Sequence, residues 1–218
     1  MMREKQSLIE GKRPIRVLAL LDSLSRAAIS PAPLRVVHEV AYLANVLAPV
    51  FDLSPFSASL LKRRGGPYYP AFQDSIDRLV GRGLIVATDL RYVHVQEENR
   101  YRLDAKYQLN ADLTVAVLER YRYIYADTPE VLFLDELAAA YSTLADEHLG
   151  RAAEKDARYA YGDVDVNNVI DFGEWAPSEK VNFSRNAALS FAPDAGLLPA
   201  ERLYLYLDHL RQRVASGI

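Results

Sequence analysis

Residues 70–85 read PAFQDSIDRLVGRGLI, and the pattern of this stretch decides the fold. Its apolar side chains recur at i, i+4, i+7 and i+8, which places them on a single stripe of a helix. They are Phe72, Ile76, Leu79 and Val80. Pro70 suits the first position of a helix, and Gly81 and Gly83 predict its end because glycine adopts the left-handed conformation without a steric penalty. We therefore predict an amphipathic helix that begins at Pro70 and ends near Gly81.

Two further helices are predicted before this one. The first ends before residues 30–33, SPAP. The second covers residues 34–48 and ends at Pro49. Residues 49–67 should then form a long connection that carries a short helix over residues 58–64. A glycine pair and a proline end that connection and lead into the helix at Pro70.

A β-hairpin is predicted directly after the helix. Residues 84–88 are apolar and β-branched, and the apolar residues of 91–96 and 100–103 alternate around an acidic tip at 97–99. This alternation is typical of a half-buried hairpin. Helix, glycine, strand and hairpin follow one another in the winged-helix order.

The rest of the chain is predicted to be helical. In the helix over residues 113–125, Val117, Tyr121 and Ile124 fall on one side. The β-type pattern stops near residues 108–112 and does not return. The predicted fold class is mainly α with a small β-hairpin, divided into a polar N-terminal segment, a winged helix-turn-helix domain and a helical domain at residues 1–13, 14–109 and 110–218.

Composition excludes several classes of function. The 218 residues contain no cysteine, which removes disulfides and every thiolate site, and fits a reducing cytoplasm. No apolar run approaches the roughly 20 residues needed to span a bilayer, so we expect no membrane insertion. The net charge of −3 provides no bulk attraction to a polyanion.

Signals for catalysis are also missing from the sequence. It has no Walker-type phosphate loop, no His-Glu-x-x-His motif and no Gly-x-Ser-x-Gly elbow, so we expect a protein that is not an enzyme and has no cofactor. The four histidines are scattered singly. His38 is the most interesting because it borders an apolar stripe, and we expect a buried imidazole with its hydrogen bonds satisfied.

The third helix of a winged helix normally enters the major groove of DNA. Here the inward stripe leaves Asp74, Asp77, Arg78 and Gly81 on the outward face, which is net negative. Each unfavourable unit-charge contact at a separation of about 4 Å costs on the order of 1 kcal/mol even in water. We therefore expect this face to bind the major groove of DNA poorly. Asp74 and Asp77 become candidate contacts for a protein partner instead.

A basic triplet, Lys62-Arg63-Arg64, is the exception to this acidic surface. The glycines that follow it could let the backbone approach a phosphate closely. The alternatives are docking on an acidic partner and a solvated run of charge. Arg78, Arg100 and Arg102 extend the candidate DNA-phosphate or partner contacts, and the aromatic pair Tyr68 and Tyr69 suits a protein interface.

A calcium-like loop occurs at residues 163–174. Oxygen-bearing side chains occupy positions 1, 3, 5, 9 and 12, as in an EF-hand. They are Asp163, Asp165, Asn167, Asp171 and Glu174. Asn168 replaces the required glycine, and Pro177 falls where the exiting helix should begin, so an acidic surface loop is the alternative. The same carboxylates with Asp156 lack the lysine of a magnesium-dependent nuclease site.

Three stretches carry a resemblance to a known family. They are AYLANVLAP, LLKRRGGPYYP and LVGRGLI at residues 41–49, 60–70 and 79–85. In these stretches the chain resembles the middle components of bacterial ABC-three-component systems, which include Lamassu-type antiviral defence. The resemblance implies a non-catalytic subunit that bridges a structural-maintenance-of-chromosomes (SMC) or Rad50-like ATPase to an effector or to DNA.

The sequence therefore leaves three hypotheses about the function of the chain. In the first, the chain is a winged-helix adaptor that holds a protein partner and meets DNA only through its complex. In the second, it is a winged-helix transcription regulator that anchors phosphates through residues 62–64. In the third, the loop at residues 163–174 makes it an EF-hand-like calcium-binding protein.

Overall fold

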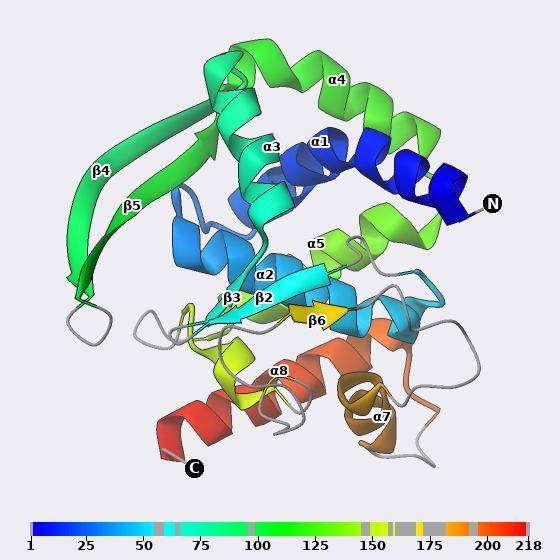
Figure 1. Cartoon of the computed structure of the whole chain (residues 1–218). Helices are drawn as coiled ribbons and strands as arrows, with labels where there is room; N and C mark the ends of the chain where they lie inside the picture. The colour runs from blue at the N-terminus through cyan, green and yellow to red at the C-terminus, as the bar shows by residue number, and fades with distance from the viewer. Residues whose placement is uncertain are drawn as a thin grey trace.

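A computed structural model describes the chain over residues 2–54, 59–63, 66–95, 99–144, 149–156, 159, 169–171, 182–191 and 196–216, with the backbone alone at 2–10, 59–63, 95, 100 and 169–171. The protein is mainly helical with two small antiparallel sheets (Figure 1). The helices are α1 (Met2–Arg26), α2 (Leu34–Leu47), α3 (Pro70–Gly81), α4 (Ala111–Ile124), α5 (Pro129–Ser142), α7 (Phe183–Ser190) and α8 (Pro199–Ser216), with the 3-10 turns η1 (Ala48–Phe51) and η4 (Ala152–Lys155). The strands are β1 (Ala32–Pro33), β2 (Ser59–Arg63), β3 (Gly66–Tyr68), β4 (Ile85–Val95), β5 (Arg100–Leu109) and β6 (Val169–Asp171).

The predicted helix at residue 70 is confirmed as α3. It begins at Pro70, and Phe72, Ile76 and Leu79 are buried on its inner side. Gly83 lies just beyond its end with a φ of 73°, in the left-handed region that favours glycine. The first helix takes in the predicted polar segment, because α1 runs without a break from Met2 to Arg26.

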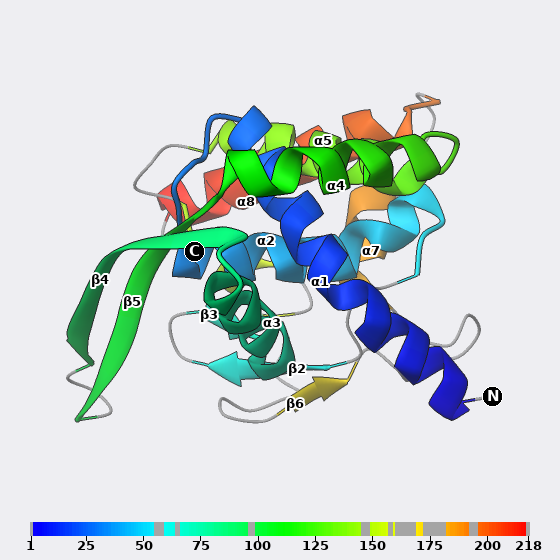
Figure 2. The same cartoon turned by 90° about the horizontal axis from the view of Figure 1, so that it is seen from above.

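The hairpin is longer than predicted and less buried. Strands β4 and β5 pair from Ile85↔Leu109 to Val95↔Arg100, and β1 adds beside β5 to complete the order β1-β5-β4. Only its base reaches the core, where Tyr107 is buried. Its outer part curves away from the helices (Figures 1 and 2), and Tyr92 and Tyr101 are 75% and 70% exposed there.

A second sheet corrects two predictions. Residues 59–63 form strand β2 where a short helix was predicted, and the β pattern returns at residues 169–171 as β6. The order of this sheet is β3-β2-β6, so β2 pairs with β3 on one side and with a strand from the second half of the chain on the other. The sheet thereby joins the two predicted domains.

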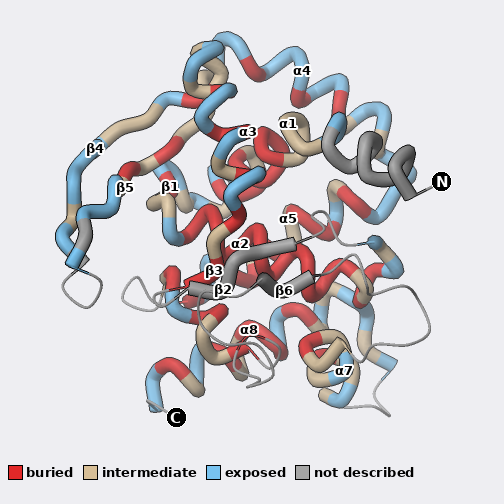
Figure 3. Tube along the Cα trace, viewed as in Figure 1, coloured by how far each residue is buried: buried red, intermediate tan, exposed pale blue. Residues whose placement is uncertain are grey.

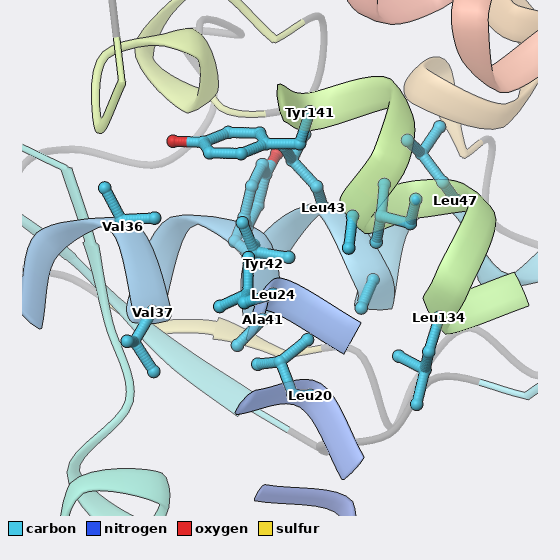
Figure 4. Close-up of a cluster of buried hydrophobic side chains, with 14 of the residues drawn as sticks. Leu20, Leu24, Val36, Val37, Ala41, Tyr42, Leu43, Leu47, Leu134 and Tyr141 are labelled. Carbon is cyan, nitrogen blue, oxygen red and sulfur yellow. The ribbon is translucent and has the colours of Figure 1, made fainter. Parts of the chain in front are cut away.

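Helix α2 lies at the centre of the protein (Figure 3), and every residue from Val36 to Leu47 is buried. In the close-up of Figure 4 its side chains meet Leu20 and Leu24 of α1 and Leu134 and Tyr141 of α5. The stretch Leu34–Phe51 is long and apolar enough to cross a membrane by length and composition, and 78% of it is buried inside the protein.

Two buried carboxylates tie α2 to the second half of the chain. Glu39 accepts hydrogen bonds from the Tyr141 hydroxyl and, at 2.6 Å, from the backbone N–H of Ala153. Burial raises the pKa of Glu39 to about 7, against these hydrogen bonds, which favour the ionised form. Asp156 accepts from the hydroxyls of Tyr42, Ser184 and Tyr206, which come from α2, α7 and α8.

The substitution Glu39→Gln should make the stability of the protein less dependent on pH. Between pH 4.5, the ordinary pKa, and about 7, the raised value, the folded state binds more protons than the unfolded state, so the contribution of Glu39 to stability falls as the pH rises. The full shift corresponds to a loss on the order of 3 kcal/mol. Urea unfolding at about pH 5 and about pH 8 should show Glu39→Gln gaining stability relative to the wild type at the higher pH.

The matched control is Glu119→Gln, on the exposed side of α4, which should leave the pH profile unchanged. A Glu39→Gln profile that ran parallel to the wild-type profile would contradict the raised pKa.

Candidate interaction surfaces

The outward face of α3 carries the charges predicted from the sequence. Asp74, Asp77, Arg78 and Gly81 are all exposed. Arg78 forms an ion pair with Asp74 at 3.0 Å, and Asp77 accepts a hydrogen bond from Gln73 at 2.8 Å. The one cation of this face therefore already faces a carboxylate of its own helix, and Asp77 leaves the face net negative.

A cleft of about 380 Å³ lies between the hairpin and the body of the protein. Its walls come from the first turns of α2, from β3, from α3 and from the β5 strand of the hairpin. Of the residues predicted to form a site, the cleft brings together Tyr68, Asp77 and Arg102. Asp74 and Arg78 are not among its lining residues.

A hydrogen-bonded chain stabilises the inner wall of this cleft. Nδ1 of His38 accepts from the backbone N–H of Tyr69 at 3.2 Å, so Nε2 carries the hydrogen and donates to Oε1 of Gln73 at 2.9 Å. The amide nitrogen of Gln73 then donates to Asp77 at 2.8 Å and to the Tyr107 hydroxyl at 3.3 Å. Burial raises the pKa of Tyr107. Both ring nitrogens of His38 are bonded, which confirms the predicted satisfied imidazole and leaves neither nitrogen available as a general base.

The prediction of a partner contact is wrong for Tyr69. Its side chain is 2% exposed, and its hydroxyl accepts a hydrogen bond from Asn45 at 2.6 Å. Burial holds its pKa well above the usual range of a tyrosine. Tyr68, its neighbour, lies at the cleft and is half-buried. Side chains of adjacent residues in an extended segment point to opposite sides, so one aromatic ring enters the core and the other reaches the surface.

The first two residues of the basic triplet lie one strand away from the cleft. In the register of the second sheet, Lys62 pairs with Pro67 and Arg63 pairs with Gly66, and both partners line the cleft. Arg64 lies outside the described residues. The proposed contact of the triplet with phosphate or with a partner stays a prediction.

The two remaining arginines lie on β5. Arg102 is exposed and pairs in register with Val93, and Arg100 pairs with Val95 near the tip of the hairpin. Only the backbone of Arg100 is described.

Helix α4 exposes an apolar face that the sequence did not predict. Its buried residues are Thr114, Leu118 and Tyr121, whereas five large apolar side chains are between 41% and 75% exposed. They are Leu113, Val115, Val117, Tyr123 and Ile124. Of the three residues that the sequence places on one side, Tyr121 is buried and Val117 and Ile124 are exposed. Apolar residues occur all round this helix, so their periodicity does not show which side is buried.

The calcium-like loop falls almost entirely outside the described residues. Asp163, Asp165, Asn167 and Glu174 lie there, and only the backbone of Asp171 is described, at the end of β6 opposite Ser59. Within the part of the chain that the structure describes, no group of three or more His, Cys, Asp or Glu side chains could hold a metal ion. Calcium binding stays a prediction.

Comparisons of the chain with family models, with curated proteins and with solved structures give no match. Function must therefore be argued from the surfaces themselves.

The substitution Gln73→Ala should destabilise the protein by about 1–3 kcal/mol, because it leaves the buried Nε2–H of His38 without its acceptor. Urea unfolding measures this loss. Gln212→Ala is the matched control, since Gln212 also donates to an aspartate one helical turn away, Asp208, but does so at an exposed site. Equal losses of unfolding free energy in the two variants would show that the hydrogen bonds of Gln73 stabilise the protein no more than an exposed hydrogen bond does.

Proposed function

We propose that this chain is a non-catalytic adaptor subunit, a winged helix used for protein contact and joined to a helical region. In this proposal it bridges an ATPase of the structural-maintenance-of-chromosomes type to an effector or to DNA within a bacterial antiviral defence complex. DNA is met through the complex and not by α3.

The element order supports the winged-helix assignment. Helix α1, strand β1, helices α2 and α3 and the hairpin β4–β5 follow one another, and β1 adds beside β5, the returning strand of the hairpin. One departure concerns the link between α2 and α3. A helix-turn-helix uses a turn of about 3–4 residues there. In this chain η1, β2 and β3 fill that link.

The exposed apolar face of α4 is the observation that carries the adaptor proposal. Single exposed apolar side chains are common, but large contiguous apolar patches mark contacts with other proteins. Leu113, Val117 and Ile124 recur at i, i+4 and i+11 along one side of α4, and each is more than 40% exposed. This is the spacing by which a helix buries a stripe against another helix.

The acidic face of α3 counts against the alternative of a transcription regulator. A helix that reads the major groove places its side chains beside phosphates, where Asp74 and Asp77 would meet like charge. Arg78 would have to leave Asp74, its partner at 3.0 Å, to contact a phosphate. Residues 62–64 therefore remain the candidates for any phosphate contact.

Charges placed on α4 should break the complex without unfolding the protein. We expect the wild type, produced together with the proteins encoded beside it, to copurify with a coiled-coil ATPase. The double substitution Val117→Glu and Ile124→Glu should weaken that association at least about tenfold, which corresponds to about 1.4 kcal/mol. Its melting temperature should stay close to that of the wild type, because neither side chain belongs to the buried core.

The matched control for this experiment is Leu205→Glu, at an exposed apolar position of α8. Copurification that survives the α4 substitutions, or that is lost equally with Leu205→Glu, would count against α4 as the contact.

The isolated chain should bind duplex DNA weakly and without sequence preference. If residues 62–64 contact three phosphates, the logarithm of the binding constant should fall with the logarithm of the salt concentration with a slope of about −2.7. Fluorescence anisotropy with the triple alanine variant of Lys62, Arg63 and Arg64 should show that slope disappear. Arg78→Ala should leave it unchanged. Tight, sequence-specific binding by the chain alone would favour the regulator over the adaptor.

A further inference from the structure

The first sheet has an open edge beside the cleft. Strand β1 pairs with β5 only at Ala32↔Tyr107 and Pro33↔Lys106, and the chain then leaves the sheet because α2 begins at Leu34. From Ala105 to Arg100, the side of β5 opposite β4 has no partner strand among the described residues. Every second residue of such an edge directs its backbone N–H and C=O outward, where they can bond an added strand.

Two hollows border this part of β5. Tyr101, Leu103 and Asp104 line the cleft of about 380 Å³, and Asp104, Lys106 and Pro33 line a second hollow of about 370 Å³. Both hollows meet at Asp104, next to the point where β1 ends. Hollows therefore border β5 beside the point where β1 ends.

We propose that an extended segment of a partner protein adds to this edge as a strand antiparallel to β5 and continues the line of β1. Such strand addition uses backbone hydrogen bonds for affinity and alternate side chains for specificity. Six residues, 100–105, provide an edge of roughly 20 Å. This inference rests on the proposed adaptor function in one respect, since a partner chain must supply the strand.

The side chains beside the edge define the chemistry of the segment. Tyr101 and Leu103 lie on one face of the hairpin and are 70% and 43% exposed, so they offer apolar contacts. Arg102 lies on the other face. The two other cations described on that face, Arg91 and Lys106, are held by Asp104 and Asp89, whereas no described side chain pairs with Arg102.

The occupant should therefore alternate apolar and acidic residues. Read from its N-terminus, its order opposite Leu103, Arg102 and Tyr101 should be apolar, acidic, apolar, because an antiparallel strand meets β5 in descending residue number. An acidic side chain at the central position gives Arg102 the carboxylate that the described part of this chain does not supply.

A phage-displayed library of random peptides, selected against the full chain, tests the proposal. We expect the enriched peptides to share the order apolar, acidic, apolar. In calorimetry with the synthetic consensus peptide, N-methylation of alternate backbone amides should weaken binding by about tenfold for each lost N–H donor, and methylation of the intervening amides should not. A library that enriches no peptide, or binding that is indifferent to N-methylation, would overturn the proposal.

A second experiment exchanges the charges of Arg102 and of the central residue of the peptide. Arg102→Glu should weaken binding of the acidic consensus peptide by about tenfold, and a peptide with lysine at the central position should restore it. Arg120→Glu, at an exposed position of α4, is the control and should bind as the wild type does. Failure of the lysine peptide to rescue Arg102→Glu would overturn the assigned order.

Two further measurements distinguish strand addition at β5 from the α4 contact and from self-association of the chain. The α4 variant with Val117→Glu and Ile124→Glu should bind the consensus peptide normally, so a failure of the α4 contact and a failure of the β5 edge give different results. A dimer of the free chain that dissociates when the peptide is added would identify a second copy as the occupant and would overturn the assignment to a partner protein.

Discussion

The complete burial of α2 is the constraint on which the rest of the structure depends. A helix with no exposed side from Val36 to Leu47 must find a partner for each polar group that it carries inward. Glu39 and Tyr42 find theirs more than a hundred residues along the chain, at Tyr141, Ala153 and Asp156. The second half of the chain is thus required to complete the core of the first. Burial disfavours the ionised carboxylate of Glu39 and so raises its pKa.

The same helix also organises the surface. His38 follows the first turn of α2, and its two ring nitrogens reach the backbone before α3 and the side chain of Gln73 on α3. Gln73 in turn bonds the hydroxyl of Tyr107, at the base of the hairpin. One chain of hydrogen bonds therefore holds α2, α3 and β5 around the cleft. The fold determines where the open edge of β5 lies, and of the described side chains along that edge only Ala105, at its inner end, belongs to the core.

How much could be read from the sequence depended on whether a segment was determined locally. Helix α3 was predicted closely because Pro70, a clean apolar stripe and two glycines at its end are all local signals. Strands β2 and β6 were missed because short strands are stabilised by a partner, and each is the partner of the other across more than a hundred residues. The buried side of α4 could not be predicted because apolar residues surround that helix. Tyr68 and Tyr69 are adjacent tyrosines that the sequence does not distinguish. Only the direction in which each side chain points at β3 decides which one enters the core.

The distribution of surface chemistry favours the proposed adaptor over a reader of DNA. A reader concentrates cations on one face, since affinity for DNA grows with each phosphate neutralised. Here the cations are dispersed, and several are held by carboxylates of the chain, as Arg78, Arg91 and Lys106 are. Among the described residues, the surfaces left without partners are instead an apolar helix face on α4 and a backbone edge on β5. In the proposed function these two surfaces recognise polypeptides by different means, one by apolar area and the other by backbone hydrogen bonds, so they need not compete for the same segment. A subunit that bridges two components requires two such independent contacts.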